Sequence, residues 1–343
     1  MSDVGWRPDL LGEGFEQLTL PLGADDEGEV VATLVRSLPH RSALPWRRGP
    51  YDGLDVLYVH GWSDYFFQTQ LARFYTERGA RFFALDLRKY GRSLRPGQTA
   101  GYVTDLATYD EDLVAALSEI GYAVDGGPGA DPSRRLLLLG HSTGGLVLTL
   151  WAHRHPGVAA GLLLNSPWLE FQLPRWSRET IRPLVGWQAR LAPHDRGPQL
   201  DLGFYSRAQR EVADPDHPYE VNPAWRPEQT MPVHAGWLNA VLEGHGQVAD
   251  GLDVREPVGV LLSKRSAIPV RWSEDLTRAD SVLTVDDVAQ AALGVGPSVT
   301  VMRIDGALHD VFLSRHDARV EAFFRMEEWV GGFMATETLR RAR

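Results

Sequence analysis

Short apolar runs alternate with amphipathic stretches through the first half of the chain. Apolar positions recur at helical spacing in residues 65–79, 104–121 and 146–151. The shorter runs that predict strands cover residues 15–20, 29–36, 55–59, 81–86, 136–139 and 161–165. An acidic turn between the first two runs predicts a hairpin. The later connections are long enough for parallel crossovers, so the pattern predicts an α/β fold with a mostly parallel central sheet flanked by helices.

The alternation stops at residue 168 and resumes near residue 256. Between these positions the chain is rich in tryptophan, proline and histidine, and no short apolar strand recurs. A structureless stretch of this length is improbable inside a compact domain, so residues 168–255 are expected to form an inserted helical cap. Strands at 257–263 and 298–304 and helices at 286–293 and 315–333 then complete a core formed by residues 15–167 and 256–336.

Composition narrows the class of protein. The chain has 343 residues, of which 43% are hydrophobic, so it can bury a sizeable core. It has no cysteine, which excludes disulfides, thiolate metal sites and cysteine nucleophiles. The net charge of −10 argues against a nucleic-acid partner. Neither a signal peptide nor an apolar run of membrane-spanning length is visible, so we expect a cytoplasmic protein without an integral membrane segment.

A run of four leucines at 136–139 leads directly into the chain's most informative motif, Gly-x-Ser-x-Gly at 140–144. A buried strand, a sharp turn and a helix form the context in which this motif exposes a nucleophilic serine. The helix that follows directs its positive end at that serine and favours negative charge there. The sequence therefore predicts that Ser142 is a nucleophile.

A serine nucleophile needs a histidine base and an acid that orients the histidine. In this kind of elbow the chain order is nucleophile, acid, histidine. Of the eleven histidines, only His309 and His316 follow the resumed sheet. His316 lies at the start of the final amphipathic stretch and is expected to be solvated. His309 lies in a loop just past the last strand and is the predicted base.

Four motifs together resemble the α/β-hydrolase superfamily. They are His-Gly at 60–61, Asp-Leu-Arg-x-Tyr-Gly-x-Ser at 86–93, Gly-His-Ser-Thr-Gly-Gly at 140–145 and Gly-x-x-His at 306–309. The chain looks most like the lysophospholipase and monoacylglycerol-lipase-like serine hydrolases, also called serine aminopeptidase-like. The resemblance covers roughly residues 28–167 and 256–335 and implies the α/β-hydrolase fold. The cap has no recognisable counterpart.

The acid of the triad is the least obvious member. In the branch that the chain resembles, the acid follows directly after the strand that here is 258–263, but this sequence continues with Lys264-Arg265-Ser266. Asp280 resembles the acid of that branch in its local sequence and lies about thirty residues before His309, the usual separation. This assignment requires residues 264–279 to form an extra loop. Asp286 and Asp287 are the rivals, and they are also typical of the first turn of a helix.

Two backbone N–H groups are expected to form an oxyanion hole for the tetrahedral intermediate. One belongs to Thr143, which follows the nucleophile. The other, by resemblance, belongs to Trp62, which follows His60-Gly61. His60 is expected to support this loop and not to transfer protons.

The resemblance implies a cofactor-independent serine hydrolase that cleaves a small-molecule carboxylic ester through an acyl-enzyme on Ser142. Aromatic residues of the cap are expected to shield the acyl pocket, or else to hold the cap on the core: Trp168, Phe171, Trp176, Trp187 and Trp237. A peptidase, amidase, thioesterase or acyltransferase would use the same residues, and a ligand-binding homologue without catalysis is a further alternative. The oligomeric state is not predicted.

Overall fold

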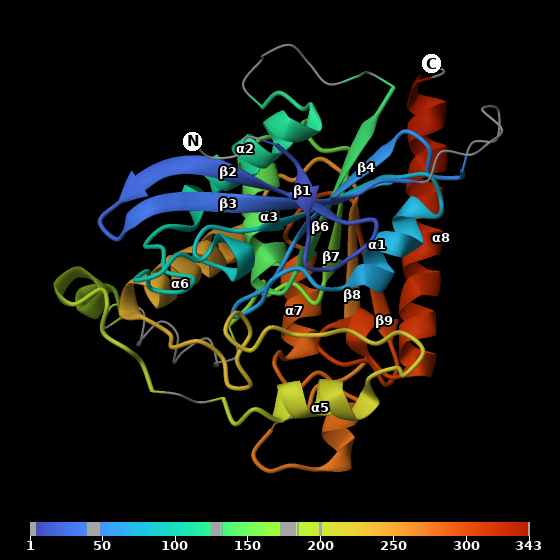
Figure 1. Ribbon diagram of the computed structural model, residues 1–343. Coiled ribbons are helices and arrows are strands. Elements are labelled where there is room, and N and C mark those ends of the chain that lie inside the picture. Colours follow the sequence, from blue (N-terminus) through green and yellow to red (C-terminus); the bar gives the residue numbers. More distant parts are fainter. Residues whose placement is uncertain are drawn as a thin grey trace.

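A single nine-stranded sheet forms the centre of the protein in the computed structural model (Figure 1). The structure describes residues 5–39, 49–124, 131, 133–171, 183, 185–198, 201–267 and 269–341. The strands lie in the order β1-β2-β3-β5-β4-β6-β7-β8-β9. Their bounds are β1 Arg7–Pro8, β2 Glu16–Asp25, β3 Gly28–Ser37, β4 Leu54–Val59, β5 Arg81–Asp86, β6 Arg135–His141, β7 Gly161–Asn165, β8 Val258–Ser263 and β9 Val299–Ile304.

The sheet is antiparallel at one edge and parallel elsewhere. The predicted hairpin is the β2–β3 pair, and β3 runs antiparallel to β5. From β5 through β4, β6, β7 and β8 to β9 all pairs are parallel. The predicted α/β architecture is confirmed. Because parallel strands end at the same edge of a sheet, the loops after β4, β6 and β9 can meet there.

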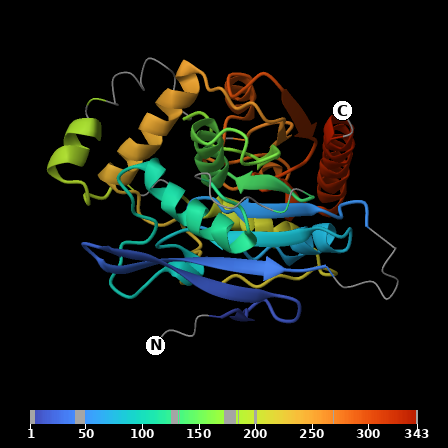
Figure 2. The same ribbon diagram turned by 90° about the horizontal axis from the view of Figure 1, so that it is seen from above.

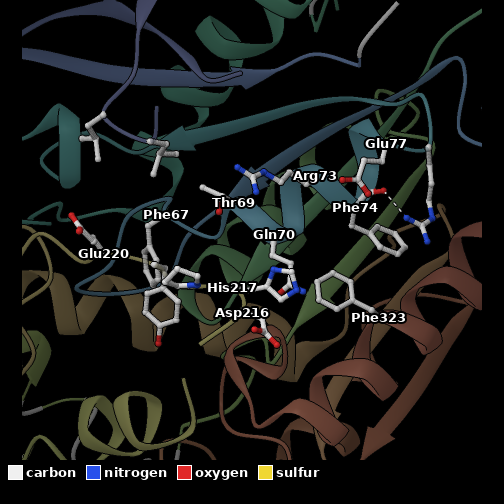
Figure 3. A pocket seen from close by; sticks show the side chains of 15 residues that line it. Phe67, Thr69, Gln70, Arg73, Phe74, Glu77, Asp216, His217, Glu220 and Phe323 are labelled. Carbon is white, nitrogen blue, oxygen red and sulfur yellow. Dashed lines mark hydrogen bonds between the residues drawn. The ribbon is translucent and has the colours of Figure 1, made fainter. Parts of the chain in front are cut away.

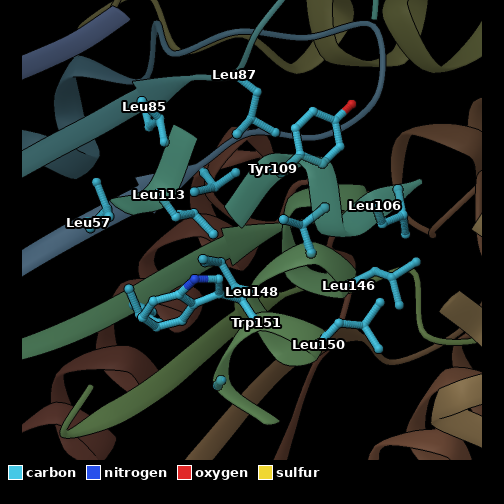
Figure 4. Close-up of a cluster of buried hydrophobic side chains, with 14 of the residues drawn as sticks. Leu57, Leu85, Leu87, Leu106, Tyr109, Leu113, Leu146, Leu148, Leu150 and Trp151 are labelled. Carbon is cyan, nitrogen blue, oxygen red and sulfur yellow. The ribbon is translucent and has the colours of Figure 1, made fainter. Parts of the chain in front are cut away.

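Helices cover both faces of the sheet (Figure 2). The bounds of the helices are α1 Thr69–Thr76, α2 Tyr109–Ile120, α3 Thr143–Arg154, α5 Phe204–Val212, α6 Ala235–Asp250, α7 Val285–Ala292 and α8 His316–Arg341, of which α5 lies beyond the strand ends and not on a face of the sheet. Side chains alternate across a strand. In β4, Leu57 and Val59 belong to one buried cluster with residues of α2, α3, α6 and α7, part of which is drawn in Figure 4, whereas Val56 and Tyr58 belong to another cluster with residues of α1 and α8. The sheet is therefore buried on both faces, as continuous apolar strands require.

The described part of the predicted cap contains α5 and α6, and α6 belongs to the main core. Trp237 and Val241 of α6 are fully buried in the same cluster as α2 and α3. A Cβ on Gly244 would lie 2.9 Å from Leu106 and 3.1 Å from Leu150. Such close packing means that the carboxyl-terminal part of the insertion contributes to the stability of the sheet domain. No helix in the described ranges is both long and apolar enough to cross a bilayer.

The predicted helix at 65–79 is wrong at its start, because α1 begins only at Thr69. Tyr65, Phe66 and Phe67 are all at most 1% exposed. Three consecutive buried side chains cannot share one face of a helix. The N–H of Phe66 instead donates to Oδ1 of Asp86 at 2.9 Å, which holds this segment as an irregular loop at the end of the sheet.

Candidate active site

Ser142 lies in the sharp turn between β6 and α3, where the sequence predicts the nucleophile. Its φ is 51° and its ψ is −119°. This backbone conformation costs a non-glycine residue free energy and persists only where the surrounding structure holds it. The N–H of Ser142 donates to the carbonyl of Asn165 at 3.0 Å, and its carbonyl accepts from the N–H of Trp168 at 2.9 Å. Hydrogen bonds to the end of β7 therefore hold the strained turn.

The glycines of the motif allow α3 to approach the end of β4. A Cβ on Gly144 would lie 2.3 Å from the carbonyl oxygen of His60 and 2.4 Å from that of Val59. A Cβ on Gly140 would lie 2.7 Å from Cα of Gly145. These distances are too short for any side chain, which explains why glycine is needed on both sides of the serine.

His309 lies in the loop after β9 and contacts the predicted acid. Its Nδ1 donates to Oδ2 of Asp280 at 2.9 Å, and the two side chains are 3% and 0% exposed. Oδ1 of Asp280 accepts from the N–H groups of Val282 at 2.7 Å and Leu283 at 2.8 Å. Each carboxylate oxygen thus has a defined hydrogen-bond partner, and the predicted role of His309 as base would use its other ring nitrogen, Nε2.

An excursion of the chain brings Asp280 to the end of β8. Ser266 and Asp280 form a parallel bridge. The N–H of Asp280 donates to the carbonyl of Arg265 at 3.1 Å, and that of Ala267 donates to the carbonyl of Asp280 at 2.7 Å. The chain leaves the sheet after Ser266 and returns beside it. The expected extra loop therefore delivers a carboxylate to the strand end where Lys264-Arg265-Ser266 lacks one.

A pocket of about 160 Å³ contains Ser142 and His309. Its lining also includes Trp62 and Thr143, whose N–H groups are the predicted oxyanion donors, together with Gly61, Ser63, Asp64, His141, Trp168, Asp201, Tyr205, Ser206, Arg226, Pro227, Thr230, Val282 and Leu283. A larger cavity of about 590 Å³ lies between α1, α8 and residues 216–220 (Figure 3), and none of the predicted catalytic side chains lines it. The smaller pocket is therefore the candidate site. Among the described residues, no group of three or more His, Asp or Glu side chains could hold a metal ion.

The backbone of Gly61 passes directly against Ser142. A Cβ at this position would lie 2.9 Å from Cβ of Ser142. His60 holds the turn: its Nε2 accepts from the N–H of Leu87 at 3.1 Å, so its Nδ1 carries the proton and donates to the carbonyl of Gly61 at 2.8 Å. Burial lowers the pKa of His60 and keeps the ring neutral. These contacts match the supporting role expected for His60.

His141, which directly precedes the nucleophile, lies 5.0 Å from the ring of His309, centroid to centroid. Its Nδ1 donates to the carbonyl of Asn165 at 3.1 Å. Burial lowers the pKa of His141, and the nearby His309 lowers it further. A neutral ring at this position does not repel a positive charge on the neighbouring ring of His309.

The aromatic residues predicted either to shield the acyl pocket or to hold the cap on the core lie in different surroundings. Of the four that the structure describes, Trp168 lines the pocket, and Phe171 stacks on Trp168 with ring centroids 5.8 Å apart. Trp237 is 1% exposed and Trp187 is 63% exposed, and neither lines the pocket. Trp176 lies outside the described residues. Composition alone did not distinguish a core tryptophan from a surface one.

Sequence reasoning missed several polar residues of the pocket, among them Asp64, Tyr205 and Arg226. Asp64 follows the predicted oxyanion residue by two positions, a signal that could have been used. Tyr205 and Arg226 belong to the insertion, where no motif pointed to them.

Comparison with protein families gives one match that covers more than half of the chain. The family described as serine aminopeptidase, S33, matches residues 54–244. A non-heme chloroperoxidase from Streptomyces lividans is 38% identical over 121 residues, which is 34% of this chain and 38% of that protein. The chain thus aligns with well under half the length of this curated relative.

Solved structures with the same fold include several enzymes of lipids and esters. A monoacylglycerol lipase from Paleococcus ferrophilus aligns over 88% of this chain and 99% of its own, with a TM-score of 0.60 and 17% identity. A soluble variant of monoglyceride lipase from Saccharomyces cerevisiae aligns over 92% and 96%, with a TM-score of 0.60 and 14% identity. An esterase from Thermogutta terrifontis aligns over 93% and 99%, with a TM-score of 0.52 and 18% identity. At these identities the similarity shows the fold alone.

Proposed function

The chain belongs to the serine aminopeptidase S33 family of α/β hydrolases, and on that premise we propose that it is a cofactor-independent serine hydrolase of small carboxylic esters. One observation carries the proposal. A serine in a strained elbow lines the same pocket as a histidine whose Nδ1 is bonded to a fully buried carboxylate. This arrangement supports nucleophilic catalysis by Ser142 with His309 as base and Asp280 as the orienting acid.

In the proposed reaction, Oγ of Ser142 attacks the acyl carbon while Nε2 of His309 takes the serine proton. The carbonyl π electrons move to the oxygen, and the N–H groups of Trp62 and Thr143 stabilise the resulting oxyanion. Collapse of this intermediate breaks the bond to the alcohol, which leaves with the proton from His309. Water, deprotonated by the same histidine, then attacks the acyl-enzyme and releases the acid and Ser142.

The size of the pocket indicates the substrate class. Drug-sized ligands occupy pockets of roughly 300–1,000 Å³. The pocket at Ser142 measures about 160 Å³ and is bordered by the apolar side chains of Trp168, Val282 and Leu283. We therefore expect a short acyl chain to be preferred over the long chains of membrane lipids.

A series of p-nitrophenyl esters from acetate to palmitate, assayed beside Ser142→Ala, tests this function. The expected result is kcat/KM highest for the shortest acyl groups and no turnover by Ser142→Ala. Aminoacyl p-nitroanilides are included because the family description names aminopeptidases. Faster turnover of an anilide than of every ester would replace the esterase assignment with a peptidase.

A further inference from the structure

The loop that carries the predicted oxyanion donor is contacted residue by residue by a segment of the insertion. We call residues 61–67 the oxyanion loop and residues 219–237 the return segment. The rings of Trp62 and Trp237 lie 3.7 Å apart, centroid to centroid. Oγ of Ser63 accepts from the N–H of Met231 at 3.0 Å. The beginning of the oxyanion loop therefore contacts the end of the return segment.

The remaining contacts continue in the opposite chain direction. The hydroxyl oxygen of Tyr65 accepts from the N–H of Asn222 at 2.8 Å, and its ring lies 5.2 Å from that of Trp225. The ring of Phe67 lies 5.3 Å from that of Tyr219. Successive positions of the oxyanion loop thus meet successively earlier positions of the return segment, so the two run antiparallel side by side.

An ion pair lies in the middle of this arrangement. Nε of Arg226 lies 2.9 Å from Oδ1 of Asp64, and the two side chains are 12% and 8% exposed. Arg226 also donates from its Nη2 to Oε1 of Gln209, on α5, at 2.6 Å. Nε and Nη2 of the guanidinium therefore contact protein groups of both the oxyanion loop and the insertion.

The same residues continue to the loop of the predicted base. Nε2 of Gln209 donates to the hydroxyl oxygen of Tyr205 at 2.8 Å. That oxygen also accepts from the N–H of Asp310 at 3.0 Å. The ring of Tyr205 meets that of His309 edge-on, with centroids 5.6 Å apart. A continuous chain of polar contacts thus joins Asp64 to the residue that follows His309.

The oxyanion loop has a backbone strain that such contacts can maintain. Ser63 has a φ of 53°, a left-handed conformation that costs a non-glycine residue free energy. Trp62, whose N–H is the predicted oxyanion donor, directly precedes it. A small relaxation at Ser63 would turn that N–H away from the position of the oxyanion, and a misplacement of about 1 Å can lower a rate about 100-fold.

We propose that Arg226 is a positioning residue, which couples the oxyanion loop through Asp64 to the His309 loop through Gln209 and Tyr205. This proposal rests on the proposed function, because it assigns the insertion a role in assembling the same site. A substrate-binding role for Arg226, whose side chain also lines the pocket, would instead raise KM at unchanged kcat.

The test compares Arg226→Met with Arg210→Met. Arg210 also lies in the insertion and also pairs with a carboxylate, that of Glu228, but its side chain is 58% exposed and lies outside the candidate site. With p-nitrophenyl acetate, Arg226→Met is expected to lower kcat about 100-fold. KM should change less than about threefold, because the proposed role of Arg226 acts through the two loops and not through the substrate. Arg226→Lys, which keeps the charge near Asp64, should restore part of kcat. Arg210→Met should match the wild type.

Because Arg226→Met leaves Asp64 without its partner, thermal melting is measured for every variant. If Arg226→Met does not fold, the double variant Asp64→Asn/Arg226→Met and Arg226→Lys take its place in the comparison. Folded Arg226→Met, or the folded double variant, with the kcat of Arg210→Met overturns the proposal, as does a rise in KM at unchanged kcat. A wild type that neither turns over esters nor reacts with a fluorophosphonate overturns the proposed function itself and this proposal with it.

Discussion

Replacing Asp280 with asparagine is predicted to invert the tautomer of His309. Oδ1 of Asp280 accepts from two backbone N–H groups, so this position must remain an oxygen in the variant. The amide nitrogen is then forced into the position of Oδ2, where it faces Nδ1 of His309. An NH₂ group there can only donate, so Nδ1 must accept and the ring proton moves to Nε2, the nitrogen that should take the serine proton.

The expected loss in kcat for Asp280→Asn is up to about 10⁴-fold, or about 5.4 kcal/mol of transition-state stabilisation. Initial rates with p-nitrophenyl acetate would measure it, and the rate of fluorophosphonate labelling would report the same loss without turnover. The protein should remain folded, since both backbone donors keep their acceptor.

Asp286→Asn is the matched control. Its carboxylate is 83% exposed, pairs with Arg303 at 2.7 Å and lies in the first turn of α7. Asp287, the other rival, occupies the same turn. These substitutions should change kcat little and cost at most about 1 kcal/mol of stability. If folded Asp280→Asn kept kcat within tenfold of the wild type, the reasoning about the tautomer would be refuted.

Two further predictions concern the turn at Gly61 and the buried histidines. In steady-state assays, Gly61→Ala should lower kcat more than it raises KM, because the new Cβ would lie 2.9 Å from Cβ of Ser142. Unchanged kinetics would show that the loop shifts to accommodate the Cβ. Burial lowers the pKa values of His60 and His141, so as the pH decreases from 6.5 the unfolded chain binds protons before the folded protein does. The free energy of unfolding should therefore fall, by at most about 1.4 kcal/mol per pH unit for each of the two histidines. Urea titrations between pH 7 and 5.5 should show a weaker pH dependence for His60→Gln, and an equal dependence would contradict this cause.

The local sequence was sufficient to predict those structural features that depend on residues adjacent in the chain. The leucine run, the glycines around Ser142 and the apolar strands predicted the sheet and the elbow, because strand, turn and helix are each determined by neighbouring side chains. The family identified from these motifs and the α/β architecture are both confirmed.

Features that depend on contacts between segments distant in the chain were harder to predict from the sequence. Asp280 could be chosen from its motif, but its position beside Ser266 depends on a β-bridge at the base of the loop between these two residues. The start of α1 was misjudged because Tyr65, Phe66 and Phe67 are buried by the sheet end and the return segment, which helical periodicity does not reveal. The pairing of Asp64 with Arg226 had no local signal at all.

The central claim is that Ser142 is a nucleophile activated by His309. Intact-mass and peptide mass spectrometry after treatment with a fluorophosphonate tests it most directly. We predict one adduct per chain, located on Ser142, with no adduct on Ser142→Ala and much slower labelling of His309→Ala. A folded wild-type protein that remains unlabelled, or an adduct that persists in Ser142→Ala, would contradict it.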